Sequence, residues 1–273
     1  MRTVVHLSDL HFGRVDNALL RPLQEMIGVL APHLVVVSGD LTQRARTAEF
    51  VAARDFLRTL PVPQIVVPGN HDVSLHNLFN RFVRPLDKYR RFITNDLAPQ
   101  YIDDEIAVFG INTARSLTFK NGRVALAELD RLHTQLAQLP SPLTKIIVTH
   151  HPFDLPERLD YHELAGRAPA AMALFADCGA DVLLAGHLHA SHAGSSAARY
   201  PVVDFAALVV QAGTATSTRA RGESNSFNVL RIDSAAIAVE RYHWLPAVGV
   251  VAGHFALATT ECFIRAEKVW QAH

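Results

Sequence analysis

Short runs of apolar, mostly β-branched residues recur along the first two-thirds of the chain. A continuous apolar run is typical of a strand that is covered on both faces of its sheet. The runs therefore predict buried strands, which lie at residues 3–7, 34–37, 65–67, 106–109, 146–148 and 182–184.

Three longer stretches between these runs carry apolar residues every three or four positions. This spacing places the apolar side chains on one face, and it predicts amphipathic helices at residues 17–30, 47–60 and 126–139. Strands that alternate with helices predict an α/β fold, with a largely parallel or mixed sheet and helices on its faces.

The pattern changes after residue 189, where strand-like runs follow one another without a long helix, at residues 202–203, 208–210, 227–232 and 237–241. They predict a second, mainly antiparallel sheet that packs face to face with the first. We expect a single domain over residues 1–273. The last stretch, 242–273, has three interpretations: it completes a sheet, caps the functional site or forms a subunit interface.

Residue types that bind metals follow directly after five of the predicted strands, at residues 9–11, 39–40, 69–72, 149–151 and 186–189. Loops held by a rigid sheet are where functional side chains are usually placed. The candidate ligands in these loops are Asp9, His11, Asp40, Asn70, His150, His187 and His189. Seven ligands are too many for one cation, and they suit two cations that share a bridging carboxylate.

The spacing inside the loops supports a metal site. Side chains alternate along a strand, so Asp9 and His11 can point toward one cation together. Asp40 follows two small residues, and its two oxygens make it the natural bridge between two cations. Each motif by itself also occurs as an ordinary turn, but five of them after successive strands favour a binuclear centre.

Charge and cysteine content limit the classes of partner and compartment. Lys plus Arg equals Asp plus Glu at 26 each, which disfavours nucleic acid or an anionic membrane as the main partner. The apolar stretch 245–258 is too short and too interrupted for a membrane span. Two cysteines without Cys-x-x-Cys spacing, and a first strand at residue 3 with no signal peptide before it, predict a reduced, cytoplasmic protein.

The five loops together resemble the signature blocks of the calcineurin-like metallophosphoesterase superfamily. The matching segments are Asp9-Leu10-His11-Phe12-Gly13, Gly39-Asp40-Leu41-Thr42, Gly69-Asn70-His71-Asp72, His150-His151-Pro152 and Gly186-His187-Leu188-His189. The resemblance spans residues 1 to about 190 and implies a four-layer α/β/β/α sandwich of two mixed β-sheets flanked by helices. Residues 212–217 and 225–228 resemble the bacterial branch that includes class III cyclic nucleotide phosphodiesterases and glycerophosphodiesterase-like enzymes.

The resemblance implies a role for each ligand. One metal would be held by Asp9, His11, Asp40 and His189, and the second by Asp40, Asn70, His150 and His187. Nitrogen and oxygen ligands without thiolate suit Fe, Mn, Zn or Co. A water that bridges two such ions becomes hydroxide near neutral pH and attacks phosphorus.

Catalytic roles are implied for His71 and Asp72. His71 would donate a hydrogen bond or a proton to the leaving-group oxygen, and Asp72 would hold its other ring nitrogen and keep the ring charged. Asp72 can also act as the N-cap of a helix over residues 75–78.

Four further residues have two interpretations each. His151 either supports the ligands or shapes its loop, and Asn112, which follows a predicted strand, either faces the substrate or, as we expect, forms a turn. Arg219 and Arg221 either contact phosphate or, as we expect, lie in solvent.

Together these features predict a binuclear-metal phosphodiesterase that acts on small phosphodiesters, with 3′,5′-cyclic nucleotides as the first candidate and glycerophosphodiesters as the second. The nearest alternative is a phosphomonoesterase or protein phosphatase. Protein phosphatases carry arginines close to the metal blocks, and the segments Leu41-Thr42-Gln43-Arg44 and Val73-Ser74 do not match that pattern. A scaffold protein that keeps the fold but not the chemistry typically lacks metal ligands or the histidine that follows the asparagine ligand. All the candidate ligands and His71 are present here, so a non-enzymatic scaffold is disfavoured. A homodimer or a higher homo-oligomer is an open prediction.

Overall fold

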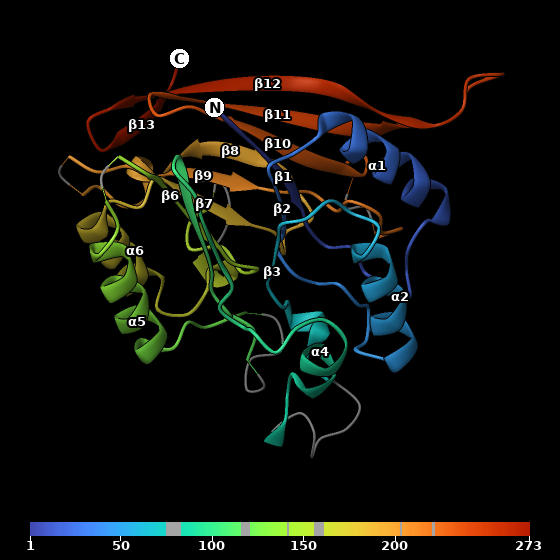
Figure 1. Cartoon of the computed structure of the whole chain (residues 1–273), viewed down its shortest axis with the longest axis horizontal. Helices are drawn as coiled ribbons and strands as arrows, with labels where there is room; N and C mark the ends of the chain where they lie inside the picture. Colours follow the sequence, from blue (N-terminus) through green and yellow to red (C-terminus); the bar gives the residue numbers. More distant parts are fainter. Residues whose placement is uncertain (75–82, 116–120, 141, 156–160, 203, 220–221) are drawn as a thin grey trace.

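The computed structural model describes residues 1–74, 83–115, 121–140, 142–155, 161–202, 204–219 and 222–273. Two β-sheets pack against each other, and helices cover their outer faces (Figure 1). Helices α1 and α2 lie on one side of the sheets, and α5 and α6 lie on the other. The predicted four-layer α/β/β/α sandwich is confirmed.

The first sheet combines both ends of the chain, in the order β13-β12-β11-β10-β1-β2-β3. Its parallel part consists of β1 (Arg2–Leu7), β2 (Leu34–Val37) and β3 (Gln64–Val66). Its antiparallel part consists of β10 (Ser226–Ile232), β11 (Ala236–Leu245), β12 (His254–Ala266) and β13 (Val269–Ala272). The two parts meet where β1 pairs antiparallel with β10.

The second sheet has the order β4-β5-β6-β7-β9-β8. Its four central strands are parallel: β5 (Ile106–Gly110), β6 (Thr144–Val148), β7 (Val182–Ala185) and β9 (Leu208–Gln211). The antiparallel edge strands are β4 (Gln100–Ile102) and β8 (His192–Ser195).

The predicted division of strands between the sheets is wrong. The C-terminal strands β10 to β13 do not form a sheet of their own but extend the one that β1 begins, and β9 lies parallel to β7 in the other sheet. An apolar run identifies a strand but not its neighbour, because pairing joins segments that are far apart in sequence. The predicted strand at 202–203 is also wrong at Val202, which forms only an isolated bridge with Phe205, and residue 203 lies outside the described residues.

Three helices lie where the periodicity predicted them: α1 (Asn17–Leu30), α2 (Thr47–Leu57) and α5 (Leu126–Ala137). Helix α1 begins where the carboxylate of Asp16 accepts a hydrogen bond from the backbone N–H of Ala18, 3.0 Å away. Helices α2 and α5 end a few residues before their predicted limits. Two further helices among the described residues, α4 (Asp87–Phe92) and α6 (Ala168–Cys178), were not predicted.

Three hydrophobic clusters separate the four layers. The middle cluster lies between the sheets and takes one face of β2 through Leu34 and Val36, while Val35 and Val37 point to the cluster under α1 and α2. The third cluster lies under α5 and α6 and includes Phe175. The stretch 242–273 extends the first sheet, so of its three interpretations sheet completion is confirmed. Among the described helices none is long and apolar enough to cross a membrane.

Candidate metal centre

The candidate ligands lie in the loops that follow β1, β2, β3, β6 and β7, and close approach of these loops requires glycine. A Cβ atom at Gly69 would overlap the backbone nitrogen and Oδ1 of Asp40. A Cβ atom at Gly186 would overlap the hydroxyl of Ser8, next to Asp9. The glycine before Asn70 therefore allows the loops after β2 and β3 to meet, and the glycine before His187 allows a loop of the second sheet to meet the loop after β1.

The backbone at most of the candidate ligands is left-handed. Positive φ angles occur at five of the seven: Asp9 (52°), His11 (50°), Asp40 (52°), His187 (74°) and His189 (58°). A residue with a Cβ atom adopts this conformation rarely, and such residues cluster at functional sites. The left-handed backbone thus coincides with the loops that carry the candidate ligands.

The first group of ligand atoms belongs to Asp9, His11 and His189, which are all buried. Nε2 of His11 and Nε2 of His189 lie 3.1 Å apart. Oδ1 of Asp9 lies 3.5 Å from the former and 3.2 Å from the latter. Three ligand atoms of the right chemistry therefore converge from the ends of β1 and β7.

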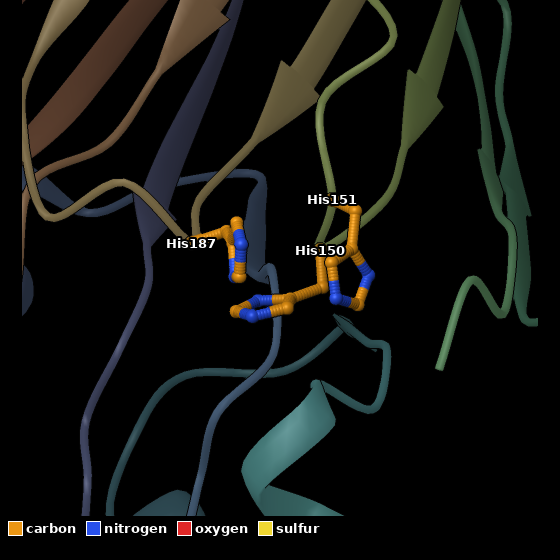
Figure 2. Close-up of side chains that lie close together, drawn as sticks. All are labelled: His150, His151 and His187. Atoms are coloured by element: carbon orange, nitrogen blue, oxygen red, sulfur yellow. The ribbon is translucent and has the colours of Figure 1, made fainter. Parts of the chain in front are cut away.

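The second group is centred on Asn70, whose Oδ1 lies 3.1 Å from Nε2 of His150 and 3.1 Å from Nδ1 of His187. Figure 2 shows the rings of His150 and His187 gathered in one place, with His151 beside them. Asp40 lies between the two groups, because its Oδ1 is 3.4 Å from Nε2 of His150 and its Oδ2 is 3.8 Å from Nε2 of His11.

The far ring nitrogens of three histidines face backbone carbonyl groups. Nδ1 of His150 lies 2.7 Å from Ser38 O, Nδ1 of His11 lies 3.4 Å from Thr42 O, and Nδ1 of His189 lies 3.3 Å from Arg219 O. A carbonyl oxygen can only accept, so each Nδ1 donates and each Nε2 is the nitrogen that faces the group of ligand atoms. A second hydrogen bond of this kind is typical of metal-binding histidine.

Charges in the centre depend strongly on one another. Burial acts to raise the pKa of Asp40, but the imidazoles, first His150, outweigh it and lower this pKa. Burial acts to lower the pKa of His150, yet the charge of Asp40 and its contact with the ring raise it to about 9. The pKa of Asp9 is also lowered, because His11 and His189 outweigh its burial. The site therefore favours ionised carboxylates and positive charge between them.

The residues present fit two divalent cations. Oδ1 of Asp9 is buried and has no hydrogen bond from the described residues, although it points at two imidazole nitrogens. Asp9, His11 and His189 form one set of convergent ligand atoms, and Asp9, Asp40 and His150 form another. Buried polar atoms of this kind normally have a partner, and a cation would supply it.

The predicted contact between Asp72 and His71 is wrong. Nδ1 of His71 lies 2.8 Å from the backbone oxygen of Gln43, to which it donates. The carboxylate of Asp72 instead accepts from the backbone N–H groups of Gly69, Leu41 and Thr42, at 3.0, 3.1 and 2.9 Å. Each residue turns to a different partner because Asp72 is the third residue of a short 3₁₀ turn (Asn70–Asp72) and points back into the loops.

Asp72 therefore joins the loop after β2 to the loop after β3. Its side chain is buried, and burial together with the negative charge of Asp40 raises its pKa to about 6. The alternative N-cap role concerns residues 75–78, which lie outside the described residues.

The four residues with two interpretations have separate outcomes. The ring of His151 lies 4.8 Å from that of His150 and 4.6 Å from that of His187, so it packs directly on two candidate ligands. Asn112 forms a turn, as its Oδ1 accepts from Ala114 N at 2.9 Å. The expectation that Arg219 lies in solvent is wrong, because it is half-buried with Nη1 3.2 Å from Nε2 of His71. Arg221 lies outside the described residues.

Two supporting contacts were missed from the sequence. Gln43 binds His71 through its backbone oxygen, so its side-chain type gave no signal. Thr214 donates from Oγ1 to the backbone oxygen of Asp9 at 2.7 Å, and this contact joins the segment 212–217 to the first ligand loop. The sequence did point to this segment, because residues 212–217 resemble the bacterial branch of cyclic nucleotide phosphodiesterases and glycerophosphodiesterase-like enzymes.

The sequence model of the calcineurin-like phosphoesterase family matches residues 2–191, and the chain belongs to this family. Membership confirms the resemblance drawn from the five loops. It also confirms the assignment to a family of metal-dependent hydrolases.

Three relatives from bacteria match part of the chain. "Uncharacterized protein YpbG" of Bacillus subtilis is 29% identical over 196 residues, which cover 68% of this chain and 61% of that protein. "3′,5′-cyclic adenosine monophosphate phosphodiesterase CpdA" of Escherichia coli K12 is 27% identical over 205 residues, which cover 68% of this chain and 69% of that protein. "Probable glycerophosphodiester phosphodiesterase GpdQ" of Arcobacter nitrofigilis is 29% identical over 162 residues, covering 58% and 57%. The chain thus matches about three-fifths to two-thirds of the length of these relatives.

Solved structures share the fold at low sequence identity. Purple acid phosphatase PPD1 from yellow lupin (Lupinus luteus) seeds superposes with a TM-score of 0.68 at 12% identity, covering 93% of this chain and 53% of that one. A dimetal phosphatase from Danio rerio superposes with a TM-score of 0.65 at 14% identity, covering 94% and 99%. At these identities the likeness concerns the arrangement of the layers, which agrees with the sandwich described above.

Proposed function

We propose that this protein is a metal-dependent phosphodiesterase that hydrolyses small phosphodiesters, with 3′,5′-cyclic nucleotides as the first candidates. The observation that carries the proposal is the position of Asp40, whose two oxygens face two separate groups of buried ligand atoms. Two relatives support the diester class, since CpdA and GpdQ are both named as phosphodiesterases.

The ligand sets follow the two groups. Asp9, His11 and His189 would hold one cation, and Asn70, His150 and His187 would hold the other, and Asp40 could contribute to both. Mn, Fe, Zn and Co all accept this nitrogen and oxygen set. When bound, the two cations supply activation of water and neutralisation of the negative charge that develops on the phosphoryl oxygens.

His71 is the proposed acid for the leaving group. Its backbone N–H donates to Oδ1 of Asp40 at 2.8 Å, and its Nδ1 donates to Gln43 O. These two bonds direct Nε2 into the site. Once protonated, Nε2 can donate to the leaving-group oxygen, which stabilises it as the bond to phosphorus breaks. Asp72 positions both loops and does not touch the reacting atoms.

A glycerophosphodiesterase is the second candidate, because the matched GpdQ relative is named for that substrate class. A phosphomonoesterase shares the same metal ligands, so the substrate preference must be measured. A scaffold without chemistry stays disfavoured, since the ligand atoms converge and the His after Asn70 is present.

The proposal is tested with protein reconstituted with Mn²⁺, by comparing hydrolysis of bis(p-nitrophenyl) phosphate with that of p-nitrophenyl phosphate. A higher kcat/KM for the diester is expected, followed by a screen of cyclic nucleotides and glycerophosphodiesters. A preference for the monoester would move the assignment to phosphatase. No turnover of any ester with two metals bound would refute the enzymatic proposal.

The cytoplasmic location and the homodimer stay predictions. The surface to examine for self-association is the turn between β11 and β12, where Val248, Val250 and Val251 are exposed. Light scattering during gel filtration measures the oligomeric state directly. If the protein dimerises through this turn, replacing Val250 by a charged residue should produce a monomer.

A further inference from the structure

Arg219 lies beyond residues 2–191, the part of the chain that the family model matches. It follows β9 in a segment that is tied to the first ligand loop. Thr214 donates to Asp9 O at 2.7 Å, and Thr216 donates to Leu10 O at 2.9 Å. Both threonine side chains are buried, so this attachment is rigid.

The end of the segment is fixed as well. The side chain of Asn225 donates to the backbone oxygen of Ser217 at 2.9 Å, and Ser217 Oγ accepts from the backbone N–H of Arg219 at 3.1 Å. The backbone oxygen of Arg219 accepts from Nδ1 of His189 at 3.3 Å. Arg219 therefore holds a candidate metal ligand with its backbone while its side chain extends over the site.

The side chain of Arg219 ends on His71. Its Nη1 lies 3.2 Å from Nε2 of His71, and arginine can only donate. Nδ1 of the same ring donates to Gln43 O, so Nε2 carries the lone pair that accepts from Arg219. The guanidinium thus lies at the same ring nitrogen that the proposed function assigns to the leaving-group oxygen.

We propose that Arg219 is a substrate-binding residue, whose guanidinium binds a non-bridging oxygen of the phosphate beside His71. An anionic phosphate oxygen is a stronger acceptor for arginine than a neutral imidazole nitrogen, and the guanidinium presents a fork of donors. When the phosphate enters, the N–H of Arg219 turns from Nε2 of His71 to that oxygen. Nε2 then no longer accepts from Arg219, and once it has taken up a proton from solvent it can donate to the leaving-group oxygen.

This inference rests on the proposed function for the identity of the substrate, but the phosphate contact can be measured without turnover. The probe is inorganic phosphate, titrated calorimetrically into Mn²⁺-loaded protein. The variants are Arg219→Gln and Arg219→Lys, and the control is Arg58→Gln. Arg58 is an exposed arginine just after the C-terminal end of α2, away from the ligand loops, so it matches the change of charge.

For Arg219→Gln we expect the dissociation constant of phosphate to rise about tenfold, because the variant loses one charge-assisted hydrogen bond to phosphate. Arg219→Lys should recover part of the loss, because a point charge replaces the fork. Arg58→Gln should bind phosphate like the wild type. Metal content and circular dichroism establish that each variant is folded and loaded.

Activity then separates this inference from the proposed function. If the wild type hydrolyses diesters, Arg219→Gln should lower kcat/KM about tenfold or more. In protein that already carries His71→Ala, the same Arg219→Gln substitution should lower kcat/KM by a smaller factor, because the side chains of Arg219 and His71 contact each other and their effects are not independent. If no ester is hydrolysed but phosphate binding still depends on Arg219, the proposed function fails and the phosphate contact stands. Phosphate affinity within twofold of the wild type in folded, loaded Arg219→Gln would overturn the inference.

Discussion

The backbone N–H of His71 donates a 2.8 Å hydrogen bond to Oδ1 of Asp40. The bond fixes the rotation of the carboxylate, so that Oδ1 faces His150 and Oδ2 faces His11. It also places the His71 ring beside the carboxylate that lies between the two ligand groups. The position of the proposed acid and that of the proposed bridge are therefore set together.

Replacing Asp40 by alanine should release metal from both positions, because each group of ligand atoms depends on one of its oxygens. We expect the bound metal to fall from two equivalents toward none and kcat/KM to fall about 1,000-fold, since the metals supply several kcal/mol of transition-state stabilisation. Metal is measured by mass spectrometry after gel filtration. Asp55→Ala, an exposed carboxylate on α2, is the matched control. Retention of both metals by Asp40→Ala would contradict the bridging role.

Replacing His71 by alanine should leave the metal content unchanged, because no candidate ligand atom is removed. The rate should fall about 100-fold or more for substrates with a poorly stabilised alkoxide leaving group, as an acid is lost. The loss should be much smaller for bis(p-nitrophenyl) phosphate, whose leaving group needs no proton. Equal losses for both kinds of substrate would show that His71 does not act on the leaving group.

Asp72→Asn should destabilise the fold rather than the chemical step. The carboxylate accepts from Gly69, Leu41 and Thr42, and an amide cannot accept at both atoms. At least one buried N–H then lacks its partner, which costs about 2 kcal/mol of unfolding free energy. Urea denaturation of the metal-free protein measures this loss, with Asp55→Asn as the exposed control. An unchanged midpoint would mean that the loops meet without Asp72.

His6 makes the protein sensitive to acid. Its ring is buried in β1 beside Ser38, with Nε2 2.9 Å from the hydroxyl, and burial lowers its pKa to about 3. In the unfolded chain the pKa is about 6.5, so between these values the unfolded state binds the extra proton. Stability is therefore complete above pH 6.5 and falls as the pH decreases from 6.5 toward 3.

From pH 7.5 to pH 5 this residue alone should remove about 2 kcal/mol of unfolding free energy. His6→Gln does not titrate, so its loss over the same interval should be smaller by about that amount. Urea unfolding of the metal-free proteins at both pH values gives the difference. Identical pH dependence of the two proteins would show that His6 does not carry this sensitivity.

The local pattern of apolar residues was sufficient to locate a helix or strand wherever that element is amphipathic or continuously apolar. Helix α1 and strand β2 have the predicted bounds because their apolar spacing is unbroken. Helix α6 was missed because its alanine-rich sequence has little contrast between its faces. The metal-binding residue types could be identified from the sequence alone because each follows a recognisable strand, and the structure brings all seven together.

Sequence alone determined the α/β class, most of the described strands and helices, and the set of candidate ligands, since these depend on the order of residue types along one segment. Only the tertiary structure decided that β10 extends the sheet of β1, that Asp72 binds loop backbone instead of His71, and that Arg219 reaches His71. Each of these joins segments that are distant along the chain. Such contacts are selected by the packing of the whole molecule, and no local period of the sequence encodes them.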